Sequence, residues 1–166
     1  MIIKTKEFIL RRPKKRDFKS FYKNFNDKLI YNNMFSPKKF PVSLKDAKKE
    51  FFNLIKNKNS FVIEVNKEIA GEITLSNLMP KLRAKISYWI GKDYRNKGIM
   101  TRAVKISTNY FFKKYQLRRI YGNVRVFNKA SCRVLEKAGY ELEGIQKKHF
   151  MKNGKYFDDF LYAKIK

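Results

Sequence analysis

The residues best suited to chemistry in this sequence lie in the short basic segment Tyr94-Arg-Asn-Lys-Gly98. Arg95 and Lys97 supply two positive charges beside Gly98, whose missing side chain lets a ligand approach the backbone closely. A helix is predicted directly afterwards, and the first turn of a helix presents unpaired amides with a partial positive charge. The segment therefore predicts a polyphosphate-binding site. The alternative is an ordinary strand-turn-helix with a solvated basic turn.

Two common phosphate loops are excluded by the sequence. Gly91-Lys92 is followed by Asp93 instead of Ser or Thr, and no upstream glycine completes a Walker A loop. The glycine triplet of a Rossmann dinucleotide site is also absent. A different kind of phosphate loop is therefore needed.

A strand before this segment and a helix after it must position the loop. Residues 84–90 alternate and are rich in aromatic and β-branched side chains, which predicts a strand, and turn-forming residues 91–93 end it. From Gly98 to about Tyr115 the apolar residues recur at helical spacing. The loop is therefore predicted at a strand-to-helix junction.

The remaining elements follow from hydrophobic periodicity, turn residues and caps. Upstream, the pattern predicts a strand at 7–12, a helix with Phe18, Phe21, Tyr22 and Phe25 on one face, a loop at 31–41 with an exposed Met34-Phe35, a helix capped by Ser43 that carries Leu44 to Ile55, strands at 60–65 and 69–75, and a loop at 76–82. Downstream, it predicts a strand at 118–124, a short helix that begins at Asn128 and is ended by Gly139, and strands at 140–151 and 155–165 joined by an Asn153-Gly154 turn. This order predicts a mixed α/β (α+β) fold in one domain spanning residues 1–166.

The composition favours a packed globular protein. Of the 166 residues 43% are hydrophobic and 16% aromatic, and no apolar run is long enough to cross a bilayer. Cys132 is the only cysteine and His149 the only histidine, so neither a disulfide framework nor a zinc site is expected. We therefore expect a cytoplasmic protein that uses no metal and does not associate with membranes.

The net charge of +26 comes from 40 Lys and Arg against 14 Asp and Glu. Such a field attracts anions, including nucleic acids, acidic proteins and phosphorylated cofactors. Because the basic residues are spread along the whole chain, contact with nucleic acid is expected to be unspecific. A lysine-rich proteome would give the same composition with no function attached.

Three blocks of the sequence resemble a known family. Arg95-Asn-Lys-Gly98-Ile-Met100, after an Ile-Ser-Tyr-Trp-Ile strand, resembles the acetyl-CoA loop of the GNAT N-acetyltransferases. Two later blocks, 128–144 and 153–162, are similar to the RimJ/RimL-type branch and follow in the same order. The resemblance covers about the second half of the chain. It implies a single mixed, mostly antiparallel twisted sheet with helices on both faces.

The resemblance also implies acetyl-CoA as co-substrate and a set of contacts with it. The pantetheine arm would pair with the backbone at Trp89 and Ile90, and Asn128 would hydrogen-bond the arm from the other side. Ser131 would stand near the CoA sulfur and stabilise the departing thiolate, although a serine in a first helical turn also commonly bonds local backbone. The pyrophosphate would lie on the amides of Arg95, Asn96, Lys97, Gly98, Ile99, Met100 and Thr101. At Met100 the family usually has a small residue.

The implied reaction is direct attack of a primary amine on the thioester, which needs a proton acceptor. Many relatives carry a glutamate at the position of Lys85, and many GNAT enzymes outside this branch carry a tyrosine at the position of Leu135. The candidate bases left in this chain are Glu72 and His149, and a water relay is the alternative. Histidine is a suitable residue type because its reference pKa is about 6.5, but a lone histidine is more often structural.

A weak base favours an amine that is already partly neutral. An α-amino group with a pKa of about 7.7–8.0 meets this condition better than a lysine side chain. The positive charge of the chain is expected to repel polyamines and aminoglycosides. We therefore expect a peptide or protein N-terminus as acceptor, such as that of a ribosomal protein. A small-molecule amine acetyltransferase and a catalytically degenerate GNAT fold that binds RNA or ribosomes are the alternatives; the protein is expected to be a monomer or homodimer.

Overall fold

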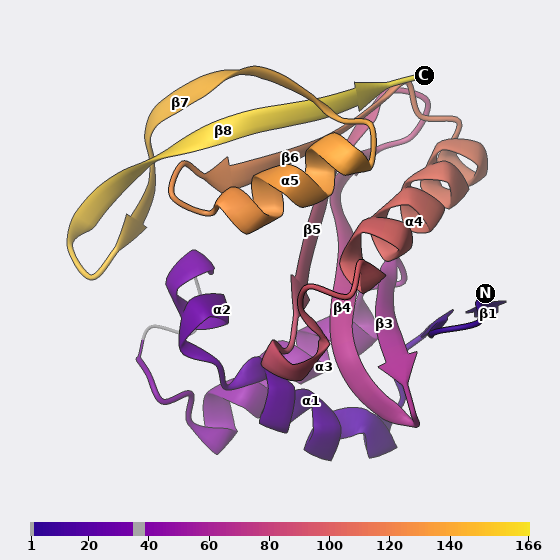
Figure 1. Ribbon diagram of the computed structural model, residues 1–166, viewed down its shortest axis with the longest axis vertical. Helices are drawn as coiled ribbons and strands as arrows, with labels where there is room; N and C mark the ends of the chain where they lie inside the picture. The colour runs from indigo at the N-terminus through magenta and orange to yellow at the C-terminus, as the bar shows by residue number, and fades with distance from the viewer. Residues whose placement is uncertain (1, 35–38) are drawn as a thin grey trace. The chain divides into compact units, whose positions relative to one another are not determined.

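The computed structural model describes residues 2–34 and 39–166 and confirms a mixed α/β fold (Figure 1). The strands are hydrogen-bonded in the order β1-β2-β3-β4-β5-β6-β8-β7. The described neighbouring pairs are antiparallel except β5–β6, so the sheet is mostly antiparallel, as predicted. Its strands are β1 (Ile2–Lys4), β2 (Ile9–Arg11), β3 (Ser60–Val65), β4 (Glu68–Met79), β5 (Arg83–Ile90), β6 (Arg119–Arg125), β7 (Glu141–Lys152) and β8 (Lys155–Ile165).

The chain divides into two compact units. The first unit contains residues 1–74 and 88–100, and the second unit contains residues 75–87 and 101–166. Of the α-helices, α1 (Phe18–Phe25), α2 (Lys28–Asn33) and α3 (Leu44–Lys56) belong to the first unit. Helix α5 (Lys129–Lys137) and most of α4 (Ile99–Tyr115) belong to the second.

Aromatic residues of α1 form the core of the first unit. Phe21 and Phe25 are almost fully buried and stack on each other with ring centroids 4.9 Å apart. Trp89 at the end of β5 packs against both rings at 5.6 and 5.5 Å. The aromatic stripe predicted from the sequence is therefore core, as expected, because burying large rings on one helical face removes much apolar area from water.

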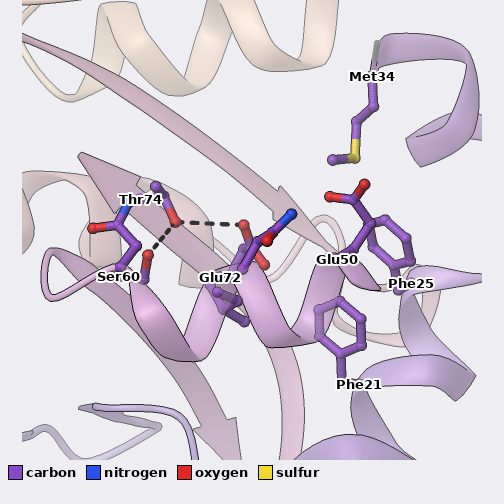
Figure 2. A pocket seen from close by; sticks show the side chains of 10 residues that line it. Phe21, Phe25, Met34, Glu50, Ser60, Glu72 and Thr74 are labelled. Atoms are coloured by element: carbon purple, nitrogen blue, oxygen red, sulfur yellow. Dashed lines mark hydrogen bonds between the residues drawn. The ribbon is translucent and has the colours of Figure 1, made fainter. Parts of the chain in front are cut away.

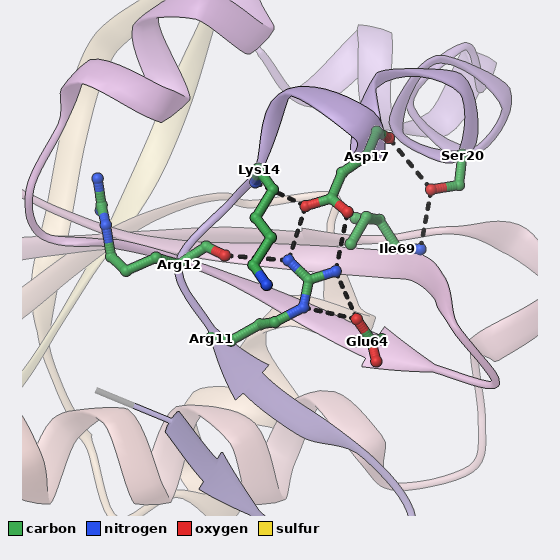
Figure 3. A network of polar contacts seen from close by, with 7 residues as sticks. All are labelled: Arg11, Arg12, Lys14, Asp17, Ser20, Glu64 and Ile69. Atoms are coloured by element: carbon green, nitrogen blue, oxygen red, sulfur yellow. Dashed lines mark hydrogen bonds and ion pairs between the residues drawn. The ribbon is translucent and has the colours of Figure 1, made fainter.

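A network of charges joins β2 to the start of α1 (Figure 3). Both terminal nitrogens of the buried Arg11 guanidinium donate to Asp17, at 2.7 and 2.8 Å, and its Nε donates to Glu64 of β3 at 2.5 Å. The backbone N–H of Lys14 also donates to Asp17, at 2.7 Å. Two carboxylates and one guanidinium thus satisfy one another inside the unit, which is the condition for burying charge without a large penalty.

In the second unit, β6, β8 and β7 form an antiparallel sheet in which β7 and β8 make a long hairpin (Figure 1). Its turn is Asn153-Gly154, with φ of 51° and 75°, as the sequence predicted. Helix α5 begins after Asn128, whose side chain accepts the Ser131 N–H at 3.2 Å. Gly139, with φ of 82°, follows the helix.

Two predicted loops were too long, and one strand was missed. Residues 31–33, predicted as loop, lie in α2, because Asp27 caps that helix by accepting the Ile30 N–H at 3.0 Å. Residues 76–79, also predicted as loop, extend β4, and the chain turns only at 80–82, where Leu82 N–H donates to Met79 O. The edge strand β1 was not predicted, because three residues are too few to show alternation.

Helices that cross a membrane were not expected, and no helix in the described part of the chain is long and apolar enough to do so. Of the predicted exposed pair Met34-Phe35, Phe35 lies outside the described residues. Met34 is only partly exposed and packs against the core of the first unit, so its predicted exposure was wrong.

Candidate acetyl-CoA and acceptor sites

The loop between β5 and α4 has a backbone shaped by two left-handed residues. Gly91 is anchored to β4 because its N–H donates to Ala70 O at 2.8 Å. Asn96 and Gly98 adopt φ of 61° and 70°, and α4 begins at the next residue, Ile99. Asn and Gly are the residues that adopt this conformation at least cost. The predicted basic loop therefore turns twice and leads directly into the N-terminus of a 17-residue helix.

The two charges of this loop differ in their surroundings. The Arg95 guanidinium donates to Asp27 at 2.8 Å and to the backbone oxygen of Ile90 at 3.3 Å. Burial alone would raise the pKa of Asp27, but its hydrogen bonds with Arg95 and the Ile30 N–H hold the pKa below its usual value. Lys97 is exposed. The Arg95 charge is thus partly compensated by Asp27, and the Arg95 backbone N–H donates to Lys92 O at 3.3 Å, so the amides that follow Arg95 are the groups to consider for phosphate binding.

Trp89 and Ile90, predicted to pair with the pantetheine arm, lie at the end of β5. The Trp89 ring is buried in the core, so only its backbone is suited to such a contact. Its carbonyl faces Gly71 of β4, where a Cβ atom would come within 2.4 Å of that oxygen. A side chain at position 71 would therefore push the strand away. Met100 is 95% buried in the described structure, so its side chain is accommodated inside the protein.

Asn128 and Ser131 lie together at the first turn of α5 in the second unit. The Asn128 side chain caps the helix through the Ser131 N–H, as its position predicted. Ser131 is partly exposed. The cap fixes the distance between the two residues, and the structure thus brings together two of the predicted site residues.

His149 lies beside a buried carboxylate that the sequence analysis did not single out. Its Nδ1 is 2.7 Å from Oδ2 of Asp159, whose side chain is fully buried and also pairs with Arg125. The Arg125 guanidinium in turn lies 3.4 Å from the Phe150 ring centroid. The pairing of β7 with β8 shifts register between Gln146 and Phe150, which is the kind of irregularity that re-aims a side chain.

Lys85, at the position where many relatives carry glutamate, is half-buried in the second unit. Burial lowers its pKa, the positive charge of Arg125 lowers it further, and Asp159 offsets part of the change. Position 85 therefore provides an amine near Arg125 and Asp159, and it does not provide the carboxylate that could act as a base.

Glu72, the other predicted base, points from β4 into a pocket of about 170 Å³ in the first unit (Figure 2). Its carboxylate accepts a long hydrogen bond of 3.5 Å from Thr74, which is itself 2.9 Å from the Ser60 hydroxyl. The pKa of Glu72 is raised to about 7, mainly by enclosure in the protein and to a smaller extent by the charge of Glu50, while the Trp89 indole and Thr74 oppose the rise. The indole nitrogen lies near the carboxylate without reaching good hydrogen-bond geometry. Part of the Glu72 side chain stays accessible through the pocket.

The predicted site residues thus fall into two groups. Glu72, Trp89, Ile90 and the loop up to Met100 belong to the first unit, whereas Thr101, Asn128, Ser131 and His149 belong to the second. Sequence reasoning missed Glu50 and Asp159, the carboxylates beside the two candidate bases. The sequence could have indicated Asp159, because two adjacent aspartates, Asp158 and Asp159, stand in the last block. Glu50 gave no such indication, because it looked like one more polar residue of an amphipathic helix.

Comparison with known proteins identifies the class to which this loop and fold belong. A family model described as "Acetyltransferase (GNAT) domain" matches residues 7–141. The chain belongs to the GNAT acetyltransferase family, and it resembles the RimJ/RimL-type branch, as the sequence indicated.

Among its curated relatives, the probable N-acetyltransferase YjcK of Bacillus subtilis is 44% identical over 48% of this chain and 44% of its own length. The spermidine N(1)-acetyltransferase of Escherichia coli K12 is 32% identical over 58% of the chain and 52% of its own length. The ribosomal protein uS5-alanine N-acetyltransferase of the same organism is 30% identical over 58% and 51%. The matched segment thus spans about half the length of these relatives.

Solved structures are similar over nearly the whole chain. The ribosomal-protein-S5-alanine acetyltransferase of Vibrio fischeri is 26% identical, with a TM-score of 0.83 over 99% of this chain and 96% of that one. The microcin C7 self-immunity acetyltransferase MccE, in complex with acetyl-CoA and AMP, is also 26% identical, with a TM-score of 0.83 over 97% and 93%. These likenesses support the fold class.

Proposed function

We propose that this protein transfers the acetyl group of acetyl-CoA to a primary amine, with the α-amine of a protein N-terminus as the acceptor. The observation that carries the proposal is the β5–α4 loop of a GNAT-family chain, in which left-handed Asn96 and Gly98 lead directly into the helix N-terminus. A helix N-terminus after a glycine is suited to a pyrophosphate. MccE, which shares the fold, is solved with acetyl-CoA.

The residues predicted to contact acetyl-CoA have the following roles in this proposal. The amides from Asn96 to Thr101 would hold the pyrophosphate, whereas the Arg95 N–H is already bonded to Lys92 O, and the exposed Lys97 would add charge. The backbone of Trp89 and Ile90 and the side chain of Asn128 would hold the pantetheine arm. In this assignment the buried Trp89 ring, Met100 and the Arg95–Asp27 ion pair shape the loop without touching the ligand.

In the reaction the amine nitrogen attacks the thioester carbonyl, the C–S bond breaks, and CoA leaves as a thiolate. Ser131 would donate a hydrogen bond to that thiolate, and Glu72 would accept the proton that the amine loses. A pKa of about 7 suits Glu72 to this role, because a general base works best near the operating pH. His149, bonded to Asp159, is the alternative base.

Two relatives point to different acceptors. The uS5-alanine N-acetyltransferase is named for a protein substrate and the spermidine N(1)-acetyltransferase for a polyamine. The net charge of +26 favours the protein N-terminus, because a cationic chain attracts an acidic polypeptide and repels a polyamine. No metal is invoked in this reaction, and this remains a prediction.

Thermal unfolding with acetyl-CoA tests the first half of the proposal. Acetyl-CoA is expected to raise the Tm by mass action, and Gly98→Val is expected to remove the shift, because a β-branched residue is strained at a φ of 70° and covers the amides. A wild-type Tm that stays constant at saturating acetyl-CoA would refute the assignment of co-substrate.

Thiol release tests the second half. Peptides with a free α-amine are expected to react faster than N-terminally blocked peptides that carry lysine, and faster than spermidine at low salt. Ser131→Ala is expected to lower kcat on the order of 10²–10³-fold with acetyl-CoA binding retained, as when one hydrogen-bond donor to a developing anion is removed. If spermidine or internal lysine is preferred at low salt, the acceptor is not a protein N-terminus.

A further inference from the structure

The pocket around Glu72 is unusual for this chain because of its charge. Lys and Arg make up 40 of the 166 residues, yet none of the described residues that line the pocket is basic. Two of them are carboxylates, Glu50 from α3 and Glu72 from β4. All lining residues belong to the first unit: Phe21, Phe25, Met34, Glu50, Asn53, Leu54, Asn57, Ser60, Glu72 and Thr74.

The two carboxylates are close enough to act on each other. The negative charge of Glu50 disfavours ionisation of Glu72, whose surroundings already disfavour it by enclosure. A bound cation would relieve both effects, since it replaces the lost hydration and offsets the repulsion. The pocket is therefore complementary to a positive charge, in contrast to the field of the whole chain.

Half of the remaining lining residues are apolar and suited to an apolar stem, namely Phe21, Phe25, Met34 and Leu54, whereas Asn53, Asn57, Ser60 and Thr74 are polar. Phe21 and Phe25 from α1 line one side, and the Met34 thioether lies near them (Figure 2). Aromatic faces attract ammonium groups as well as carbon, and a thioether adapts to irregular aliphatic shapes. Within the described residues no group of three or more His, Cys, Asp or Glu side chains could hold a metal ion, so we consider an organic cation for this pocket.

We infer that this pocket binds a primary ammonium group on a short apolar stem, with the ammonium shared by Glu50 and Glu72 and the stem against Phe21 and Phe25. The inference deepens the proposed function and rests on it in one respect, namely that the bound amine is the acetyl acceptor. Two sources carry this chemistry: a polypeptide N-terminus with a small apolar first residue, and a free alkylamine or polyamine.

Binding can be measured without acetyl-CoA by fluorescence. Trp89 is the only tryptophan and packs against Phe21 and Phe25, so excitation of indole reports on the pocket. The probes are n-hexylammonium, 1-hexanol, hexanoate and n-propylammonium. Hexylammonium is expected to saturate the signal, and hexanoate is expected not to bind. Each additional buried methylene should tighten binding about fourfold, so propylammonium should bind much more weakly.

The carboxylates are tested by Glu50→Gln and Glu72→Gln, each expected to weaken hexylammonium binding about tenfold, as for loss of one charged hydrogen-bond partner. Glu141→Gln is the matched control, because it makes the same charge change at an exposed residue of β7. Unchanged Tm values would show that the variants fold. Equal binding of hexanol and hexylammonium, no saturable binding, or full affinity in both variants would overturn the inference.

The two sources are separated by titrating an alaninyl peptide amide and spermidine in the same assay, and the tighter ligand identifies the source. Failure of the proposed function would give a different pattern, in which amines bind with Glu50-dependent affinity while acetyl-CoA produces no thermal shift and no thiol is released.

Discussion

Asp17 and Glu72 are carboxylates of the same compact unit with opposite electrostatic surroundings. Asp17 accepts two hydrogen bonds from Arg11 and one from the Lys14 backbone, which outweigh burial and lower its pKa. Enclosure in the protein raises the pKa of Glu72 to about 7, and the charge of a second carboxylate, Glu50, adds to the rise. Burial disfavours the charged form of both groups, but only Asp17 meets a guanidinium that outweighs this effect.

This difference separates structural from functional acids. A buried carboxylate bridged by a guanidinium holds elements together, as Asp17 and Glu64 do for β2, α1 and β3. Glu72 lines a pocket whose described lining residues include no Lys or Arg, and carboxylates with raised pKa values are concentrated at functional sites. The Asp159–Arg125–His149 cluster of the second unit combines both features, since its carboxylate is paired and also contacts a titratable ring.

The largest effect is expected on activity. Glu72→Gln should lower kcat on the order of 10²–10⁴-fold if Glu72 is the base, whereas Asp17→Asn should reduce stability but not the kcat of the folded fraction. Steady-state thiol release at known folded concentration measures both. A normal kcat in Glu72→Gln together with a large loss in His149→Gln would move the base to the second unit.

Removing the Arg11 guanidinium, which pairs with two carboxylates, should have the largest effect on stability. Arg11→Met removes the guanidinium shared by the buried Asp17 and the partly buried Glu64, and it should lower the free energy of unfolding by about 3–5 kcal/mol. Arg133→Met, at an exposed position of α5, is the control and should change stability by under about 0.5 kcal/mol. Urea unfolding of the two variants at pH 7 gives the comparison; similar midpoints would mean that the Arg11 network contributes little.

The pH dependence of stability should reveal the raised pKa of Glu72. Below pH 4.5 Glu72 is protonated in both the folded and the unfolded chain, and between pH 4.5 and 7 only the unfolded chain ionises. Its contribution to stability therefore falls as pH rises through this window, by at most about 3 kcal/mol. Glu72→Gln should be stabilised relative to wild type at pH 8 and not at pH 4. A constant difference across this range would contradict the raised pKa.

The smallest effect concerns the half-buried pair between Asp27 and Arg95. Asp27→Asn keeps a good helix cap and removes the charge, so it should cost only about 0.5–1 kcal/mol. Asp27→Ala removes the cap as well and should cost about 1 kcal/mol more. Denaturant midpoints of the two variants separate the ion pair from the cap, and equal losses would show that the ion pair contributes nothing.

Much of the fold could be predicted because it depends on local patterns. The α1 stripe of Phe18, Phe21 and Phe25, the Ser43 cap of α3 and the Asn153-Gly154 turn are each written in neighbouring residues. The β5–α4 loop is of the same kind, since Gly98 and the helix after it are adjacent in sequence. Family resemblance then supplied a role for that loop, which periodicity alone does not give.

What only the tertiary structure decided is which distant charges meet. From the sequence, Arg95 was predicted to contribute its charge to phosphate binding. In the folded chain its guanidinium pairs with Asp27, which is 68 residues away in the sequence. Glu50 and Glu72 come from a helix and a strand whose sequences show no sign of a shared pocket, and Asp159 meets His149 across a hairpin irregularity. The reason is physical: secondary structure follows from interactions within a few residues, whereas the pKa and partners of a carboxylate depend on every group that folding brings around it.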